Sequence, residues 1–506
     1  MSAPIQHVLI VGGGTAGWLT ASLLAASQQH IPGAALRITL VESDTVGPIG
    51  VGEGTWPTMR ETLRKIGISE DTLIRRASAT FKQASRFTDW HRRDTGNSYY
   101  HPFSAPQGSA TADITPHWLA SHTHTPYADA VCFQPALCEA GVAPKSDDPT
   151  WRGPAINYGY HLDATQFIAL LREHATRALG VRHIVDDVVS VNCADHGIAS
   201  VVTARQGALT ADLFADCSGF RSLLLDEALG TCKKDASDVL FADTALVCQQ
   251  PYASPSQPVA CYTGSTAQQA GWIWDIGLQH RRGVGHVYCS DFVSDDEAYH
   301  QLGRYLGVDD TAMPPTRKIR FHTAYNETPW VKNCVGIGLS AGFLEPLEAS
   351  ALMLIEQGAT LLATQLPAHS TTLPQVAKRY NETLSHQWQS AIRFLKLHYA
   401  LSNRPEAFWV ENRRASTLPD TLQELLEEWQ YRPPMDDDFA HRADVFSAQS
   451  YRYVFYGMQG RTCPDNLRTF ADSDFASQQF SFNALLTEKL LAALPSHRAL
   501  LDSLTR

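Results

Sequence analysis

His7-Val8-Leu9-Ile10-Val11-Gly12-Gly13-Gly14-Thr15-Ala16-Gly17 is the stretch of sequence that decides the fold. The apolar run predicts a buried strand, and Gly12, Gly14 and Gly17 satisfy the pattern GxGxxG. In such a turn the first glycine permits a tight bend, the second lets the backbone approach a pyrophosphate, and the third lets the next helix pack on the strand. Because the pattern alone is weak, a nucleotide-binding interpretation needs support from the residues that follow.

A second predicted strand provides that support. It runs from Leu36 to Val41 and ends at Glu42, 25 positions after Gly17. An acidic residue at this point accepts a hydrogen bond from a ribose hydroxyl. We therefore favour a dinucleotide site over the alternative of an incidental glycine-rich turn.

Composition limits the class of protein. A chain of 506 residues predicts two or three modules and room to bury a large cofactor. The 41 Lys and Arg against 52 Asp and Glu give a net charge of −11, which argues against nucleic acid or an acidic membrane surface as a partner. Ten scattered cysteines without a CxxC pair predict reduced thiols, no structural metal and a cytoplasmic location, and no apolar run is long enough to span a membrane.

Two further glycine-rich stretches could face a bound group. The segment from Gly47 to Pro57 is too rich in Gly and Pro for a helix or a central strand, so it predicts a shaped loop, packed against a flavin ring or, alternatively, a surface linker. The stretch from Gly338 to Ala351 leads into an apolar helix. There Ser350 is predicted to cap the helix, whose free N–H groups would face an anion.

The remaining chain alternates between predicted elements and irregular segments. Tyr99 to Pro154 reads as a long excursion without periodicity, in which His122 and His124 are interpreted as surface residues, not as metal ligands. The acidic run 436–438 predicts a solvated turn. The main predicted helices and strands are Met59–Arg75 (helix), Ala79–Trp90 (strand), a helix capped by Asp163 that ends near Ala178, the strands Arg182–Val191 and Ile198–Arg205, and a mostly helical segment after residue 367.

Several motifs together resemble the flavin-dependent tryptophan halogenase family, from the first strand to roughly residue 410. Each motif is weak alone, but eight of them occur in the family's order. They are Gly-Gly-Gly-Thr-Ala-Gly-Trp at 12–18, Gly-Val-Gly-Glu-Gly-Thr at 50–55, Thr-Phe-Lys at 80–82, His-Pro-Phe at 101–103, Asp-Cys-Ser-Gly-Phe-Arg at 216–221, Trp-Ile-Trp-Asp-Ile at 272–276, Leu-Glu-Pro-Leu-Glu at 344–348 and Leu-His-Tyr at 397–399.

The resemblance implies an α/β fold with a FAD-binding GxGxxG module of the glutathione-reductase type and a mostly helical C-terminal substrate module. The FAD-binding module would comprise residues 1–98, 155–250 and 317–366, and the substrate module residues 99–154, 251–316 and 367–506. The cofactor would be FAD, delivered as FADH2 by a separate NAD(P)H-dependent flavin reductase, and the resemblance implies pairing as a homodimer. Cofactor-binding residues implied by the resemblance are Gly12, Gly13, Gly14, Thr15, Ala16, Gly17, Glu42, Gly50, Val51, Val188 and Leu339.

The implied reaction uses FADH2, O2 and halide to make hypohalous acid, which moves through a tunnel to an aromatic substrate. The family's catalytic lysine maps onto Lys82 and its catalytic glutamate onto Glu348. Its halide ligands fall at Ser350 and Ala351. The substrate wall falls on His101, Phe103, Trp272 and Trp274; from strand periodicity alone, Trp272 and Trp274 share one face and are either a core pair or such a wall.

Two departures from the family pattern affect the expected substrate and halide. The family's Ile-Pro becomes Ile276-Gly277, and Glu-Ser-Thr-Gly becomes Glu348-Ala349-Ser350-Ala351. The segment from Tyr451 to Tyr456 carries no clear tryptophan contacts, so an indole or another electron-rich aromatic compound is the expected substrate class. A single-component flavin monooxygenase and a non-catalytic flavin-binding homologue remain alternatives, although no second GxGxxG unit is present for a nicotinamide cofactor.

Overall fold

The computed structural model describes residues 4–29, 36–45, 47, 52–148, 150–439, 443–465 and 467–506. The chain divides into two compact units. The first contains Met1–Ser78, Leu162–Ala236 and His322–Gln389, and the second contains Ala79–His161, Ser237–Phe321 and Ser390–Arg506. These boundaries differ from the expected modules mainly at residues 79–98, 237–250 and 367–389. Because the expected modules were defined by their ligands, their assignment stays a prediction.

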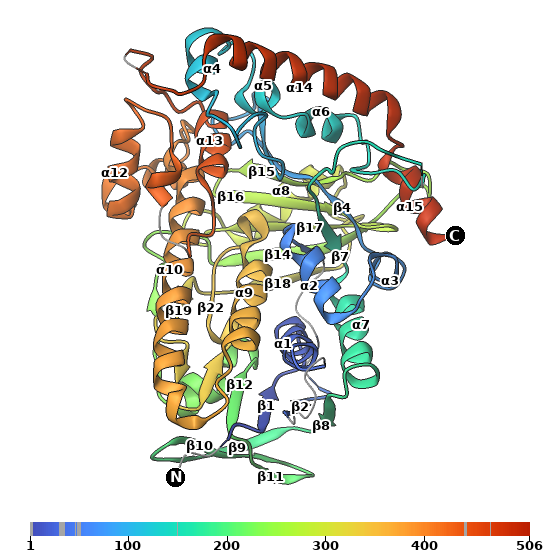
Figure 1. The fold of residues 1–506 in the computed structure, drawn as a ribbon, viewed down its shortest axis with the longest axis vertical. Coiled ribbons are helices and arrows are strands. Elements are labelled where there is room, and N and C mark those ends of the chain that lie inside the picture. The colour runs from blue at the N-terminus through green and yellow to red at the C-terminus, as the bar shows by residue number, and fades with distance from the viewer. Residues whose placement is uncertain are drawn as a thin grey trace. The chain divides into compact units, whose positions relative to one another are not determined.

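The first unit is built on a six-stranded sheet with the order β20-β21-β12-β1-β2-β8. The pairs from β21 to β8 are all parallel, and β20 is antiparallel to β21. This arrangement confirms the two strands predicted on either side of the glycine-rich turn (Figure 1). The strands are β1 (His7–Val11), β2 (Arg37–Glu42), β8 (Arg182–Val185), β12 (Leu213–Asp216), β20 (Trp330–Val331) and β21 (Cys334–Gly336).

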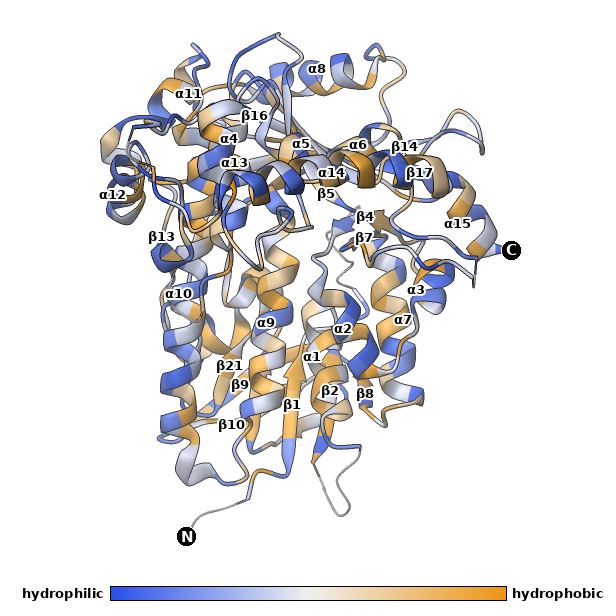
Figure 2. Ribbon diagram, turned by 45° about the horizontal axis from the view of Figure 1, so that its top comes forward, coloured by the Kyte–Doolittle hydropathy of each residue, from blue (hydrophilic) through white to orange (hydrophobic). Residues whose placement is uncertain are grey.

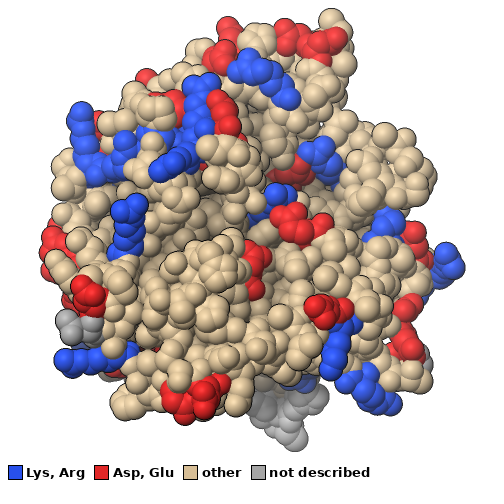
Figure 3. Space-filling view, turned by 90° about the horizontal axis from the view of Figure 1, so that it is seen from above, with Lys and Arg blue, Asp and Glu red and all other residues tan. Residues whose placement is uncertain are grey.

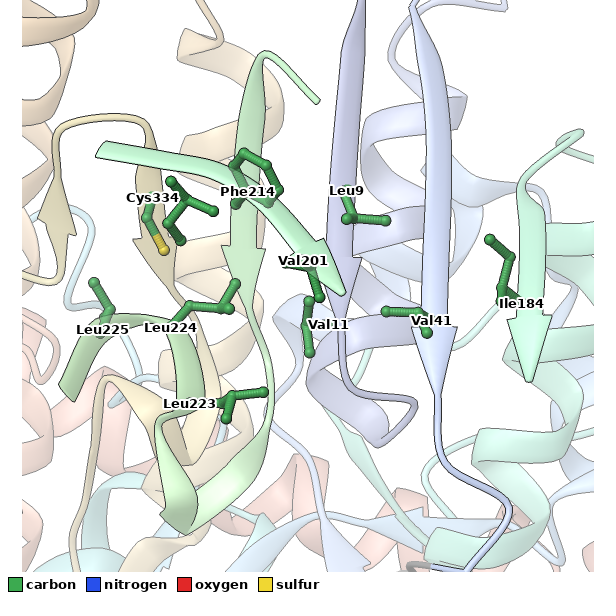
Figure 4. Close-up of a cluster of buried hydrophobic side chains, with 11 residues drawn as sticks. Leu9, Val11, Val41, Ile184, Val201, Phe214, Leu223, Leu224, Leu225 and Cys334 are labelled. Carbon is green, nitrogen blue, oxygen red and sulfur yellow. The ribbon is translucent and has the colours of Figure 1, made fainter. Parts of the chain in front are cut away.

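Fully buried apolar residues explain why these strands form a parallel sheet. Every residue of β1 and of β12 is buried, as expected for strands covered on both faces. One face packs against a second sheet, formed by β9 (Val188–Ala194), β10 (Gly197–Thr203) and β11 (Gly207–Leu209). The side chains of Leu9, Val11, Val41, Phe214 and Val201 meet there in one apolar cluster (Figure 4).

Helices cover the other face of the sheet. Helix α1 (Thr15–Ala26) packs against α2 (Thr58–Ile66), α7 (Ala164–Arg177) and α9 (Ser350–Gln365), and β1, β2 and α1 are coloured as largely apolar in Figure 2. Asp163 caps α7 as predicted, because its carboxylate accepts a hydrogen bond from the N–H of Gln166 at 3.0 Å. Further elements of this unit include β3 (Glu53–Gly54), α3 (Glu70–Arg76), β13 (Lys234–Asp235), β19 (Ala324–Tyr325) and β22 (Gly342–Phe343).

The predicted helix from Met59 to Arg75 is wrong as a single element. It ends at Gly67, which has a φ of +84°, and α3 begins again after Ser69. Glycine adopts this left-handed conformation without steric cost and commonly terminates helices. Ser69 then caps the next helix by accepting from the N–H of Thr72.

The second unit contains a seven-stranded sheet with the order β18-β14-β17-β16-β15-β5-β6. All neighbours are antiparallel except β15 and β5, which are parallel. The strands are β5 (Ala84–Thr88), β6 (Ser98–Pro102), β14 (Thr244–Pro251), β15 (Tyr262–Gln268), β16 (Gly271–Gly277), β17 (Arg281–Tyr288) and β18 (Thr316–Arg320).

The predicted strand from Ala79 to Trp90 is interrupted at Gln83. Before this residue, β4 (Thr80–Lys82) pairs with β7 (Gly159–Leu162); after it, β5 joins the large sheet. The N–H of Gln83 donates to the carbonyl of Cys261 at 2.7 Å, and its side chain donates to the carbonyl of Val142 at 2.8 Å. These long-range hydrogen bonds, which local periodicity does not reveal, divide the strand.

The excursion predicted for Tyr99 to Pro154 contains more structure than expected. It includes most of β6 and three short helices, α4 (Thr115–Ser121), α5 (Tyr127–Val131) and α6 (Gln134–Glu139). From Leu373 onward the regular elements of the described chain are helical, with short 3-10 turns between them. They are α10 (Leu373–Ala400), α11 (Ala407–Asn412), α12 (Asp420–Glu428), α13 (Ala448–Gly457), α14 (Ser473–Ala493) and α15 (His497–Thr505). Helix α8 (Asp295–Leu306) lies earlier in the chain, in the second unit.

The acidic run at 436–438 is not simply a solvated turn. The carboxylate of Asp438 accepts hydrogen bonds from the indole of Trp429, the guanidinium of Arg432 and the N–H of Met435. Burial alone raises the pKa of Asp438, but these hydrogen bonds outweigh it and hold the pKa below its usual value. Asp438 therefore stabilises the turn that follows α12.

Surface charge, helix composition and cysteine state are as follows in the described residues. Acidic and basic side chains are interspersed on the face in Figure 3. No helix in the described part of the chain combines the length and the apolar character needed to cross a bilayer. All ten cysteines are free thiols, and the described residues contain no group of three or more potential metal ligands.

Substitutions within the glycine-rich turn should separate packing from ligand access. A Cβ on Gly17 would lie 1.9 Å from the carbonyl oxygen of Gly12, whereas a Cβ on Gly14 would meet nothing within 4 Å. We expect Gly17→Ala to lower the free energy of unfolding by about 3 kcal/mol, and Gly14→Ala by about 1 kcal/mol or less. Urea unfolding of both variants checks this, and equal midpoints would contradict it.

Candidate active site

The glycine-rich turn lies between β1 and α1 in the first unit, where the backbones approach each other closely. Gly12 has a φ of +115°, and a Cβ there would lie 2.1 Å from the carbonyl oxygen of Cys217. Gly14, by contrast, faces open space at the start of α1, and no side chain caps that helix. An uncapped helix N-terminus beside an uncrowded glycine fits a pyrophosphate group.

Glu42 lies at the end of β2, next to this turn. A Cβ on Gly13 would lie 1.5 Å from the Oε2 atom of Glu42, so the absence of a side chain makes room for the carboxylate. The Oε1 atom lies 2.8 Å from Nε2 of His183 and 3.6 Å from Arg172. These contacts fix the carboxylate beside the turn, where it can accept hydrogen bonds from a ribose.

The remaining predicted cofactor residues are distributed around the same unit. Thr15 and Ala16 form the first turn of α1, and a Cβ on Gly338 would lie 2.7 Å from the Cβ of Ala16. Leu339 follows Gly338 in the adjoining 3-10 turn, whereas Val188 begins β9 and pairs with Thr203. Gly50 and Val51 lie outside the described residues.

The predicted catalytic Glu348 lies in an unusual backbone segment that precedes α9. Glu348 and Ala349 have φ values of +61° and +57°, which is costly for residues other than glycine. The indole N–H of Trp56 donates to the carbonyl of Glu348 at 2.9 Å. The side chain of Glu348 is only 5% exposed, so its carboxylate is largely removed from water.

The expectation that Ser350 caps α9 is wrong. The N-cap is Ala349, and Ser350 is the first helical residue, whose hydroxyl donates to the carbonyl of Leu347 at 3.4 Å. The first N–H groups of α9 therefore have no side-chain cap. Ala351 and Leu339 also line an apolar cavity of about 20 Å³.

Glu356 positions this end of α9. Sequence analysis did not select this residue, which is 3% exposed within an apolar helix. Its carboxylate accepts hydrogen bonds from the hydroxyls of Thr58 and Thr62 on α2, and burial raises its pKa. The three side chains hold α9 against α2, and Trp56, which precedes α2, holds the backbone of Glu348.

Lys82 lies on β4 in the second unit and is fully buried. Its Nζ atom lies 5.2 Å from the centre of the Phe103 ring. Phe81 points to the opposite face of the strand, where Lys145 approaches its ring to 5.4 Å. A buried ammonium group next to an aromatic ring is costly to desolvate, which is a common feature of functional lysines.

Two buried histidines adjoin Lys82 and were missed by the sequence reasoning. His161 lies on β7, the strand next to β4, and pairs with Thr80. Its Nε2 atom lies 2.9 Å from the hydroxyl of Thr263, and its Nδ1 atom has no hydrogen-bond partner in the described chain. Burial, together with the charge of Lys82, lowers the pKa of His161 well below 6.5. His497 accepts a hydrogen bond from the N–H of Phe81 at 3.0 Å. Both rings are therefore neutral near pH 7.

The predicted wall residues occupy separate positions in the second unit. His101, on β6, lies 3.0 Å from the hydroxyl of Ser450 through its Nε2 atom. Trp272 is 1% exposed and packs against Trp90 in an aromatic cluster, whereas Trp274 is half-buried over Gly285. Core packing thus accounts for Trp272, and a substrate-facing role for either tryptophan stays a prediction.

Gly277, which replaces the family's proline, has a local structural reason. A Cβ at this position would lie 2.8 Å from Val259 and 3.0 Å from the hydroxyl of Tyr252. Its carbonyl accepts a hydrogen bond from the hydroxyl of Thr80 at 2.6 Å, which fixes β4 to the end of β16. Glycine at position 277 therefore fits the crowded end of β16, which is hydrogen-bonded to the strand that carries Lys82.

The predicted site residues thus form two groups. Gly12 to Gly17, Glu42, Glu348, Ser350 and Ala351 belong to the first unit, and Lys82, His101, Phe103, Trp272 and Trp274 belong to the second. The convergence of Lys82 and Glu348 in one chamber stays a prediction.

Comparison with known proteins identifies extensive similarity. The profile of the family described as "Tryptophan halogenase" matches residues 7–473, well beyond the expected limit near residue 410. The chain is 33% identical to the tryptophan 6-halogenase SttH of Streptomyces toxytricini, over 97% of this chain and 97% of that protein.

Solved structures give the same result. A tryptophan halogenase from Shewanella frigidimarina has 43% identity and a TM-score of 0.95, covering 99% of this chain and 98% of its own. Tar14, a tryptophan C-6 flavin-dependent halogenase (chlorinase) from taromycin biosynthesis, has 33% identity and a TM-score of 0.92, covering 99% of this chain and all of its own. Nearly the whole length of the chain is therefore matched.

Protonation of His497 should destabilise the protein in mild acid. Burial lowers the pKa of His497 to about 4, so the unfolded chain takes up a proton below pH 6.5 that the folded chain does not. This contribution to stability is complete above pH 6.5 and is lost as pH falls toward 4, by about 2 kcal/mol between pH 7 and pH 5. We expect His497→Gln to reduce the shift in urea midpoint between these pH values. His196→Gln, at an exposed position, is the control, and an equal change in both variants would refute the assignment.

Proposed function

We propose that this chain, which belongs to the tryptophan halogenase family, uses Lys82 and Glu348 to halogenate an indole substrate. The reaction would consume FADH2, O2 and chloride or bromide. The observation that carries the proposal is the full burial of Lys82 on a short strand held by long-range hydrogen bonds, because structural packing alone seldom buries a lysine completely.

The residues of the glycine-rich turn fit a flavin dinucleotide. Gly14 and the uncapped start of α1 would receive the pyrophosphate, and Glu42 would accept from the ribose. Thr15, Ala16 and Leu339 would contact the cofactor nearby, and we retain Val188, Gly50 and Val51 as further candidates. The bound FADH2 would supply two of the four electrons that reduce O2, and the halide would supply the other two as it is oxidised to hypohalous acid, with water as the second product.

Lys82 would direct the oxidised halogen. Its ammonium group donates hydrogen bonds, and in a site without water such a bond to the oxygen of hypohalous acid polarises the halogen more strongly than in solution. Neutral His161 adds no second positive charge beside it. Lys82 would therefore present the halogen without a second positive charge from His161.

Glu348 would stabilise the cationic ring formed when the halogen adds, and would take up the proton that leaves. The left-handed backbone at Glu348 and Ala349 supports a functional role, because strain of this kind concentrates at active sites. The uncapped N–H groups at Ser350 and Ala351 suit a halide ion. The methyl group of Ala351 would help to set the choice between chloride and bromide.

Tryptophan is the first indole to test as the substrate. The relatives reported above are named for tryptophan and match the chain over nearly its whole length, including the segment from Tyr451 to Tyr456. His101, Phe103, Trp272 and Trp274 are the proposed wall residues. A separate flavin reductase is the proposed source of FADH2, and a homodimer stays a prediction.

Removing either proposed catalytic side chain should abolish halogenation without preventing flavin binding. We expect Lys82→Ala and Glu348→Gln to lower the rate of halogenation by about 10²–10⁴-fold. The protein, a flavin reductase, FAD, NADH and bromide are incubated with tryptophan and an indole panel, and products are measured by mass spectrometry. Lys145→Ala, which alters a lysine on the opposite face of β4, should retain activity.

Three results would contradict the proposal in different ways. Hydroxylated products, or oxidation of NAD(P)H without a reductase, would indicate a monooxygenase. Flavin binding without any product would indicate a non-catalytic homologue. Full activity of Lys82→Ala would remove the role assigned to Lys82.

The flavin assignment has its own test at Gly14. Because a methyl group there would occupy space proposed for the pyrophosphate, Gly14→Ala should weaken FAD binding by about tenfold or more, while the urea midpoint changes little. Fluorescence titration with FAD measures the affinity. Unchanged affinity would argue against pyrophosphate at this turn.

A further inference from the structure

The second unit contains a polar cavity of about 340 Å³ that the proposed halogenation does not use. Four segments meet at this cavity: the turn after β5, the end of α10, the end of α11 and the turn after α13. Its volume lies in the range of sites for small ligands. The residues that line it include Arg92, Arg413 and Arg461, one from each of three segments, together with His91 and Asn403.

The positive charge at this cavity is not neutralised by the protein. Within the described chain, no carboxylate lies within 4.0 Å of Arg92, Arg413 or Arg461 to form an ion pair. The neighbouring Arg404 and Arg93 differ, since both lie close to Glu406, at 2.6 and 3.7 Å. Three uncompensated guanidinium groups around one cavity are unusual in a chain with a net charge of −11.

The polar contacts leave donors available for a ligand. Arg413 uses its Nη1 atom to donate to the carbonyls of Arg404 and Trp409, so its Nε and Nη2 hydrogens remain for another acceptor. Arg92 and Arg461 are exposed and make no hydrogen bond through their side chains within the described chain. His91 contributes structure instead of charge, because its ring lies 3.3 Å from the carbonyl of Leu401 and 3.2 Å from the amide of Asn403.

We propose that this cavity binds a phosphate group, either as inorganic phosphate or as part of a small phosphate ester. Guanidinium groups match phosphate oxygens in geometry and form strong, charge-assisted hydrogen bonds with them. A phosphate carries nearly two negative charges near pH 7, which suits three arginines better than a singly charged carboxylate. The residues belong to one compact unit, and the proposal is independent of the halogenation chemistry.

Calorimetric titration of the full-length protein with sodium phosphate, glycerol 3-phosphate and sodium acetate tests the proposal. Excess FAD is present throughout, so that any pyrophosphate site at Gly14 is already filled. We expect phosphate or its ester to bind more tightly than acetate and to bind less tightly as ionic strength rises. The tighter of the two phosphate ligands identifies whether free phosphate or an ester is the occupant.

Variants connect the binding to the cavity. Arg461→Gln and Arg92→Gln should each weaken phosphate binding by about tenfold or more, and neither should unfold the protein because both side chains are exposed. Arg379→Gln, an exposed arginine on α10 outside the cavity, removes the same charge and should leave binding unchanged. The proposal is overturned by no binding at low ionic strength, by equal affinity for acetate, or by equal weakening in all three variants.

Discussion

The first unit depends on how closely three pieces of backbone approach one another at the end of β1. Gly12 lies against the carbonyl of Cys217 after β12, and Gly17 lies against the carbonyl of Gly12 itself. No methyl group fits at either position. The close packing of β1 and α1 therefore requires glycine at both Gly12 and Gly17. Gly14 lies between them and is not crowded. The same constraint that packs α1 on the sheet therefore leaves one uncovered position at the helix N-terminus.

The sequence predicted correctly those elements that a short run of residues or a single cap specifies. The apolar runs of β1 and β2 and the cap at Asp163 lie where the sequence indicated, because each follows from periodicity or from one side chain. The prediction of one continuous strand around Lys82 was wrong because contacts distant in the chain decide its shape. Its interruption at Gln83 depends on hydrogen bonds to Cys261 and Val142, which are distant in the chain. Gly67, which ends α2, is a local signal that correctly indicates where that helix stops.

The residues of the candidate site could be predicted only where they belong to motifs of the family. Composition and periodicity gave no reason to select Lys82, and the family resemblance alone assigned its role. Even then the resemblance did not indicate the histidines beside it, because His161 is close to Lys82 through strand pairing and His497 lies on the last helix. The Ser350 cap failed because the backbone enters α9 through left-handed residues at 348 and 349, so that Ser350 is already helical. The identity of the residues at this helix start could be predicted from the motif, whereas their backbone conformation could not.

The burial of Lys82 explains why neutral histidines suit this part of the second unit. A neutral imidazole fills the space beside this strand without adding a second charge, and His497 also accepts a hydrogen bond from the N–H of Phe81. The cost of this arrangement appears in the histidines, whose pKa values are lowered by burial. Stability in acid is therefore lost at the two histidines that pack around the strand carrying Lys82.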